Sequence, residues 1–407
     1  MGLVVQKYGG ASLASIQRIQ AVAKRITGTH QAGKKVVVVV SAMGNTTDRL
    51  YCLARKVHPM PPPRELDMLL SAGERQTMAL LSMAIMRYGE VAQSFTGSQV
   101  GIITDHYHTD ARIEEIRLSR LTQALRAGKI PIVAGFQGMS NEREITTLGR
   151  GGSDVTAVAL AAVLGADLCE LFKDVDGIFT ENPQEFTQVR HIPELTFTEL
   201  AELAQAGAEV IHPRACALAE KYRVPLIIRS SFNNKRGTMV KEKEKLEKAF
   251  VRAITHQHKL VRVALMDVKK KPRCLHQVIT KLTAARVPIL LFDHGIPHGD
   301  NFDLIFIIPK TALPLARPIL EQLTTEIGAK RLNITEKLCS VSLIGPGVGT
   351  DMEIVAETFD TLHQAKIHLE AFALTATRLT CVIDQKDLRI AVTALLTRFR
   401  LTRRQQP

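Results

Sequence analysis

The sequence predicts an α/β protein, in which a doubly wound, mostly parallel sheet is followed by two smaller α+β modules of the ferredoxin-like type. Over the first 230 residues, short aliphatic runs alternate with helical stripes, as in sheets covered by helices on both faces. Beyond residue 255 the elements shorten, and the order β-α-β-β-α occurs twice. We therefore expect three domains, at residues 1–245, 255–332 and 333–407.

The strands of the first domain are predicted from aliphatic runs. Val36–Ser41 is almost entirely β-branched, which is typical of a strand buried on both faces. Strands are expected at residues 3–6, 36–41, 130–134, 168–173 and 226–229. Apolar residues at helical spacing predict the helices, with stripes at Ile16, Ile19, Ala23 and Ile26 and at Met78, Leu81 and Ile85, and residues 155–164 are apolar nearly all round.

The two repeated units follow a charged stretch, Lys241–Lys248, which we interpret as the link between the two architectures. In the first unit we expect strands at 260–268, 288–293 and 302–308, with helices at 273–286 and 312–327. In the second unit we expect strands at 340–344, 368–374 and 378–383, with helices at 352–365 and 387–399. The Pro-rich residues 60–63 are expected to form a loop inside the first domain.

Composition narrows the class of protein. The chain has 407 residues, of which 45% are hydrophobic and 23% charged, with a formal net charge of +13. Because the basic residues are scattered and tryptophan is absent, we expect no nucleic-acid partner. The longest aliphatic run, Val36–Val40, is too short to span a bilayer, so we expect no membrane association and a cytoplasmic location. The six cysteines form no CxxC motif and are expected to be buried free thiols.

Three Gly-rich turns follow predicted strands and are candidate anion sites. In KYGGAS (7–12), a lysine precedes two glycines, although two glycines after a strand more often form a plain tight turn. LGRGGSD (148–154) brings together an arginine, a hydroxyl group and a carboxylate at the start of a helix, which is more than a helix cap requires. KDVDGIFT (173–180) is typical of a Mg²⁺ or nucleotide turn, but also of ordinary surface turns.

Other candidates are weaker. Ser41 ends a buried strand at its carboxyl end, where ligands bind in open α/β sheets, and Glu74 lies near a helix start, where it also serves the helix dipole. Thr47, on local grounds, is expected to cap a helix. His294, His298 and Asp300 surround a Gly/Pro turn without a further ligand, so we assign no metal-ligating residues.

Taken together, the order and spacing of these motifs resemble those of the aspartate kinases, which combine the amino-acid kinase fold with two C-terminal ACT modules. The resemblance covers essentially the whole chain and is strongest over residues 1–231. The motifs that carry it are KYGGAS (7–12), VVVVVSAMGNTTDRL (36–50), SAGE (71–74), AGFQG (134–138), TLGRGGSD (147–154), DVDGIFT (174–180), GAEVIHPR (207–214), RSSF (229–232) and CVIDQKDLRIAV (381–392).

The resemblance implies an ATP- and Mg²⁺-dependent kinase. It would phosphorylate the side-chain carboxylate of L-aspartate to give 4-phospho-L-aspartate, the first step of lysine, threonine and methionine (diaminopimelate) synthesis. It also implies a homo-oligomer that assembles through the ACT modules.

The same resemblance assigns site residues. Lys7 and Asp154 would be catalytic, with Lys7 on the transferring phosphate and Asp154 organising the surrounding charges. The aspartate site would consist of Ser41, Thr47, Glu74, Arg150, Gly151, Gly152 and Ser153, in which Arg150 pairs with the α-carboxylate and Glu74 with the ammonium. The ATP site would consist of Lys7, Gly9, Gly10, Lys173, Asp174, Phe179, Gln184 and Glu209.

Several residues depart from the family pattern. Tyr8, Ala11 and Val155 replace phenylalanine, a hydroxyl residue and a small hydroxyl residue, and the nucleotide side differs at Lys173, Gln184 and Glu209. The loop Met266–Arg273 and the stretch Ala373–Ala376 depart from the usual effector motifs. We expect a working kinase with weakened ATP binding; the alternative is a catalytically impaired aspartate-binding or regulatory homologue with a degraded nucleotide site.

Overall fold

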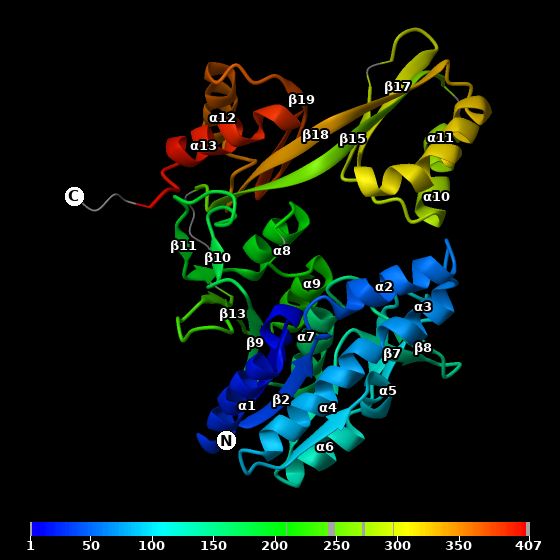
Figure 1. Cartoon of the computed structure of the whole chain (residues 1–407). Coiled ribbons are helices and arrows are strands. Elements are labelled where there is room, and N and C mark those ends of the chain that lie inside the picture. Colours follow the sequence, from blue (N-terminus) through cyan, green and yellow to red (C-terminus); the bar gives the residue numbers. More distant parts are fainter. Residues whose placement is uncertain (1, 209, 243–248, 271–272, 296, 404–407) are drawn as a thin grey trace. The chain divides into compact units, whose positions relative to one another are not determined.

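A computed structural model describes residues 2–208, 210–242, 249–270, 273–295 and 297–403. The chain divides into two compact units, which are considered separately (Figure 1). The first contains residues 1–179, 191–205 and 209–245, and the second contains residues 180–190, 206–208 and 246–407. Among the described helices, none is both long and apolar enough to cross a bilayer.

The first unit is built on an eight-stranded, mostly parallel sheet with the strand order β12-β14-β13-β9-β1-β2-β6-β3. Only β14 runs antiparallel to its neighbour β13, and β12 pairs with β14 in parallel. The strands are β1 (Leu3–Tyr8), β2 (Lys35–Val40), β3 (Ala92–Phe95), β6 (Ile130–Ala134), β9 (Leu168–Lys173), β12 (Glu194–Leu195), β13 (Leu226–Ser230) and β14 (Thr238–Val240). The carboxyl ends of the six mutually parallel strands therefore lie along one edge of the sheet.

Helices cover the faces of this sheet. On one face, α1 (Ile16–Gln31) and α4 (Ala72–Met86) share a core with alternate valines of β2, namely Val36, Val38 and Val40. The helix α7 (Gly152–Leu164), buried along most of its length, packs on β1, β2 and β9. It also contacts α9 (Pro213–Tyr222), which packs against α8 (Phe197–Gln205). The doubly wound fold is thus confirmed.

A second, four-stranded sheet with the order β5-β4-β7-β8 also belongs to the first unit and is absent from the sequence prediction. Its strands are β4 (Ile102–Thr104), β5 (Ile113–Ile116), β7 (Gln137–Ser140) and β8 (Ile145–Thr147). The remaining helices of this unit are α2 (Thr46–Val57), α3 (Pro63–Leu70), α5 (Gly97–Val100) and α6 (Ser119–Arg126). The short strands β10 (Ile178–Phe179) and β11 (His191–Ile192) pair antiparallel.

The second unit contains two β-α-β-β-α repeats that share one six-stranded antiparallel sheet, with the order β16-β17-β15-β18-β20-β19. The first repeat comprises β15 (Ala253–Lys269), α10 (Cys274–Ala284), β16 (Leu291–His294), β17 (Asn301–Pro309) and α11 (Leu313–Glu326). The second comprises β18 (Arg331–Ile344), α12 (Met352–Gln364), β19 (Leu369–Thr375), β20 (Arg378–Asp384) and α13 (Leu388–Arg398). The long strands β15 and β18 pair along the middle of this sheet (Figure 1).

Most predicted elements match the observed ones, with three local exceptions. Thr47 does not cap a helix: α2 begins at Thr46, and Asn45 occupies the cap position without a side-chain cap bond. Cys52 is exposed, whereas the other five cysteines are buried, and all six are free. Ile16 belongs to α1 but is exposed. Part of the expected link Lys241–Lys248 lies outside the described residues, as does part of the loop Met266–Arg273.

Candidate active site

Three charged side chains converge where the neighbouring parallel strands β1 and β9 end. Lys7 is the penultimate residue of β1, Lys173 is the last residue of β9, and Asp154 lies in the first turn of α7. Lys7 Nζ is 2.6 Å from Asp154 Oδ1, and Lys173 Nζ donates to Asp154 Oδ2 at 2.7 Å. Lys7 and Asp154 are buried, while Lys173 is half-buried. The sequence-predicted catalytic pair therefore lies together, with Lys173 beside it.

The charge state of this cluster follows from its burial. Burial alone raises the pKa of Asp154, but the charges of Lys173 and Lys7 outweigh it and hold that pKa well below its usual range. Burial lowers the pKa of Lys7 to about 8, because the attraction of Asp154 offsets it only in part and Lys173 repels it. Near neutral pH, two ammonium groups therefore face one carboxylate. The resulting positive charge favours an anionic ligand.

The Gly9–Gly10 turn follows Lys7 and has a clear packing role. A Cβ atom on Gly10 would lie 2.8 Å from Gly44 O and 2.9 Å from Ala42 O, so only glycine permits this close approach. The amide of Gly9 donates to Phe172 O at 3.3 Å and is therefore already engaged within the protein. Packing thus accounts for the need for Gly10.

Glu74 lies buried in the first turn of α4, and its side chain contacts a residue outside that helix. Its Oε1 accepts from Ala42 N at 3.0 Å, whereas Oε2 is buried without a hydrogen-bond partner among the described residues. Burial raises the pKa of Glu74 to about 7, against the opposing hydrogen bonds of the Glu74 and Ala42 amides and the charge of Lys7. The unpartnered oxygen is therefore available to a cationic group of a ligand.

Two further candidates for the aspartate site, Ser41 and Thr47, lie between the end of β2 and the first turn of α2. Ser41 follows β2 directly, is half-buried, and donates its amide to Tyr8 O at 3.1 Å. Thr47 is half-buried in the first turn of α2.

Residues 149–153 form the loop before α7 and the start of that helix. Gly151 has φ +71°, and a Cβ atom there would lie 2.6 Å from His212 Cβ, so the left-handed turn requires glycine. Gly151 occupies the N-cap position of α7. Ser153 and Asp154 follow it inside the helix and therefore do not serve as the N-cap. Gly152 and Ser153 are buried, whereas Arg150 is exposed and makes no ion pair among the described residues.

The turn after β9 separates its two acidic residues. Asp176 accepts from Lys235 Nζ at 2.6 Å and from Asn233 Nδ2 at 2.7 Å, so it is already paired. Asp174 is exposed, and the half-buried Phe179 packs edge-on against His191, with ring centroids 5.4 Å apart. Of the other predicted nucleotide-site residues, Gln184 belongs to the second compact unit and Glu209 lies outside the described residues.

Two residues that the sequence analysis did not single out support the loop before α7. Asp67 of α3 is fully buried and accepts from Thr147 Oγ1 at 2.5 Å and from Thr109 N at 3.0 Å. Arg214 of α9 donates to Leu148 O at 2.7 Å. A carboxylate on the otherwise apolar buried face of α3 was a signal for Asp67. Arg214 offered no local signal, because its contacts lie far away in the sequence.

The departures in the first unit are accommodated locally. The hydroxyl of Tyr8 donates to Gln6 Oε1 at 3.2 Å, and its ring stacks on Phe172 with centroids 4.6 Å apart. Ala11 is exposed, and Val155 is buried in the core. None of these three departures disturbs the cluster of Lys7, Asp154 and Lys173.

Comparison with known proteins identifies the family of this chain. Residues 2–230 match the model of the amino acid kinase family. The aspartokinase of Mycolicibacterium smegmatis is 42% identical over 407 residues, which is 98% of this chain and 97% of that protein. The crystal structure of aspartate kinase from Synechocystis is 38% identical with a TM-score of 0.55, and it covers 100% of this chain and 70% of that one. E. coli aspartokinase III in complex with aspartate and ADP shares the fold, with a TM-score of 0.84 at 23% identity over 97% of this chain and 99% of that one.

Proposed function

The chain belongs to the amino acid kinase family, and within it to the aspartokinases, and from this premise we propose that it transfers the γ-phosphoryl group of ATP to the side-chain carboxylate of L-aspartate. The product is 4-phospho-L-aspartate, which begins lysine, threonine and methionine synthesis. The observation that carries the proposal is the buried cluster of Lys7, Asp154 and Lys173 at the carboxyl ends of β1 and β9.

The chemistry asks for charge neutralisation. An aspartate carboxylate oxygen attacks the γ-phosphorus, the bond from that phosphorus to the β–γ bridging oxygen breaks, and ADP leaves. Two unit charges 4 Å apart repel by about 1 kcal/mol in water and by about 4 kcal/mol at an effective dielectric of 20. Lys7 and Lys173 reduce this repulsion by pairing with phosphate oxygens. Asp154 holds both ammonium groups in place.

The amino acid is oriented by two opposite charges in this proposal. The free Oε2 of Glu74 accepts from the ammonium of aspartate, and the exposed guanidinium of Arg150 pairs with its α-carboxylate. Ser41, Thr47 and Ser153 add hydroxyl groups, while Gly151 and Gly152 give the loop its shape. Support comes from Oε2 of Glu74, which is buried and has no hydrogen-bond partner among the described residues.

The nucleotide brings Mg²⁺ in this proposal, and the donor set fits an ion held mainly by phosphate. Mg²⁺ is usually bound by one or two carboxylates together with substrate phosphates and water. Asp154 and Asp176 are already paired with lysines, which leaves the exposed Asp174 as the candidate ligand. When bound, Mg²⁺ would withdraw charge from the phosphates. Phe179 and the Gly9–Gly10 turn complete the part of the proposed ATP site that lies in the first unit.

The alternative of an impaired homologue rests on the altered residues Lys173, Gln184 and Glu209. One observation favours activity: Lys173 contacts Asp154 and so adds a second cation to the proposed catalytic cluster. We therefore expect turnover.

Trapping the acyl phosphate tests the proposal. Purified protein with ATP, Mg²⁺ and L-aspartate should form the hydroxamate when hydroxylamine is present. Lys7→Ala should lose about 10³-fold in kcat, because a cation at the transferring phosphate is removed. Arg150→Ala should mainly raise KM for aspartate. Lys24→Ala and Arg126→Ala change exposed residues of α1 and α6 and serve as matched controls.

If the wild-type protein forms no hydroxamate but still binds aspartate in calorimetry, the chain is a catalytically impaired homologue. Equal activity of wild type and Lys7→Ala would instead overturn the assigned role of Lys7.

We also propose that the chain forms a homo-oligomer through the sheet of its second unit. The edge strand β19 exposes Phe372 and Leu374, and an edge strand with exposed apolar side chains favours pairing with another copy. Wild-type protein should therefore exceed the monomer mass of 44.9 kDa in light scattering. Phe372→Asp should shift it towards the monomer, whereas Leu315→Asp, on the exposed side of α11, should not. An oligomer unchanged by Phe372→Asp would contradict assembly through β19.

A further inference from the structure

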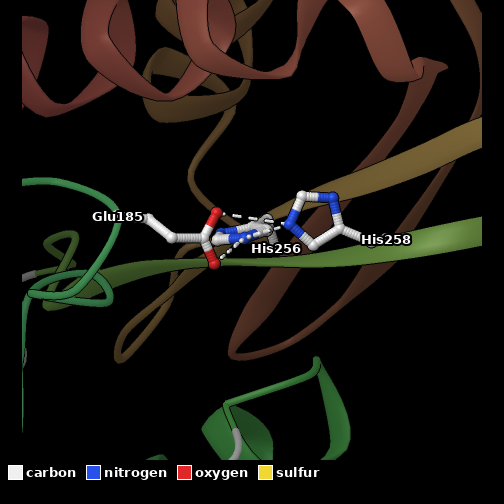
Figure 2. Close-up of side chains that lie close together, drawn as sticks. All are labelled: Glu185, His256 and His258. Atoms are coloured by element: carbon white, nitrogen blue, oxygen red, sulfur yellow. Dashed lines mark hydrogen bonds and ion pairs between the residues drawn. The ribbon is translucent and has the colours of Figure 1, made fainter.

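Three side chains in the second unit converge on one point. His256 and His258 lie on β15, and Glu185 lies on the segment 180–190 of the same unit (Figure 2). His256 Nε2 is 3.1 Å from His258 Nε2 and 3.3 Å from Glu185 Oε1. His258 Nε2 is 3.3 Å from Glu185 Oε2. Glu185 precedes His258 by 73 residues, so no local sequence pattern indicates this group.

One ligand atom from each of the three residues lies within 4.8 Å of the other two, so the group is compact enough to surround one metal ion. Zinc binds histidine nitrogen and carboxylate oxygen at about 2.0–2.2 Å, so neighbouring tetrahedral ligand atoms lie about 3.3 Å apart. Strand geometry contributes to the convergence, because the pairing of β15 with β18 shifts register between Gln257 and Leu260 and Lys259 has φ +58°. This bulge is the kind of irregularity that redirects a side chain.

The buried histidine is held by a second carboxylate. Glu181 Oε1 lies 3.0 Å from His256 Nδ1, and both residues are buried. The tautomer that donates Nδ1–H to Glu181 leaves Nε2 of His256 unprotonated and able to bind a metal ion. A carboxylate–histidine pair of this type orients metal-ligating histidines in proteins. Phe186 packs edge-on against the His256 ring, with centroids 5.8 Å apart, and further fixes its orientation.

We propose that Glu185, His256 and His258 bind one divalent transition-metal ion of the Zn²⁺ class, which clips the segment 180–190 to β15. Two imidazoles and one carboxylate favour zinc, cobalt or nickel over magnesium and calcium, which prefer all-oxygen sites. Three protein ligands leave a fourth position, on the side where His258 and Glu185 are partly exposed, for water or another small ligand.

Cobalt binding tests the proposal directly. The full-length protein is stripped of metal with a chelator, dialysed and titrated with Co²⁺, whose four-coordinate complexes absorb strongly in the visible range. Wild type should bind one equivalent, and Zn²⁺ should displace it. His258→Ala and Glu185→Gln should each weaken binding by at least about tenfold, and Glu181→Gln by about 10–100-fold through loss of the orienting contact.

Two controls keep this experiment decisive. His363→Ala removes an exposed histidine on α12 and should bind Co²⁺ like wild type. All proteins carry Cys52→Ser, because the exposed Cys52 thiol is a competing ligand. As a second readout, Zn²⁺ should slow proteolysis within residues 180–190 in wild type but not in His258→Ala. Absence of Co²⁺ binding, or equal binding by wild type and His258→Ala, would show that these residues form only a hydrogen-bonded cluster.

Discussion

At the scale of single residues, the proposed active site contains two lysines and one carboxylate in close contact. Asp154 is paired with both Lys7 and Lys173, so the cluster keeps an excess positive charge inside the protein. Burying such a group is costly unless each charge is paired or meets an incoming ligand of opposite sign. The depressed pKa of Lys7 and the raised pKa of Glu74 both record this cost. Both groups titrate close to neutral pH as a result.

We predict a bell-shaped pH dependence of kcat/KM for aspartate. Glu74, with its pKa raised to about 7 by burial, is protonated below that pH and then cannot pair with the substrate ammonium. Lys7, with its pKa lowered to about 8 by burial, loses its charge above that pH and then cannot neutralise the phosphate. Activity should therefore rise with pH through about 7 and fall with pH through about 8. Steady-state rates across pH 5.5–9.5 (roughly one and a half units beyond each limb) measure this.

Variants assign the two limbs. Glu74→Gln should lower kcat/KM and remove the acid limb, while Lys7→Arg should remove the alkaline limb, since guanidinium stays charged. Glu353→Gln is the matched control, because Glu353 also lies in the first turn of a helix, α12, but is exposed. An acid limb that persists in Glu74→Gln would show that another group controls it.

At the scale of elements, the strands that carry the site were the easiest to predict. The runs that became β2 and β6 are mainly aliphatic and buried on both faces, so hydrophobicity alone locates them. The four-stranded sheet was missed because strands such as β4 and β7 have only three and four residues and little periodicity. The start of β15 was missed because Thr255, His256 and Gln257 are polar.

The site shows the same division. Lys7 and Asp154 each lie two residues from a glycine, in motifs that follow a strand or open a helix, so local sequence indicates them. Asp67 and Arg214 act through contacts with segments far away in the chain, which a linear pattern does not encode. The orientation of the Glu74 side chain depends on a hydrogen bond from Ala42, which lies in the loop after β2.

Two glycines of the first unit should respond oppositely to alanine. Gly10→Ala places a Cβ atom within 2.9 Å of two backbone oxygens, which must move, so kcat/KM should fall by about 10²-fold. Gly28 lies within α1 with open space around it, so Gly28→Ala should stabilise the helix by about 0.5–1 kcal/mol and leave kinetics unchanged. Thermal unfolding and steady-state rates of both variants check this. Equal kinetics for the two variants would contradict the close approach at Gly10.

At the scale of the whole molecule, the division into two compact units does not follow the order of the chain. Residues 180–190 lie between β10 and β11 of the first unit but belong to the second. Within that second unit, Thr180 Oγ1 donates to Leu401 O at 2.7 Å, and the fully buried Val189 forms a bridge with Thr402. The linear domains expected at 1–245, 255–332 and 333–407 remain a prediction. A fragment cut at residue 245 would separate residues 180–190 from these partners.

This separation predicts that the fragment 1–245 is locally unfolded around residues 180–190. It loses the surroundings that bury Phe186 and Val189, and each such side chain contributes about 1.5–3 kcal/mol on burial, so roughly 3–6 kcal/mol is lost. Trypsin should therefore cleave after Arg190 much faster in the fragment than in the full chain. Cleavage after Arg126, at the end of α6 in the first unit, is the internal control and should proceed equally in both. Equal rates at Arg190 would mean that the segment keeps its conformation without the residues beyond 245, because its protection would then come from the first unit alone.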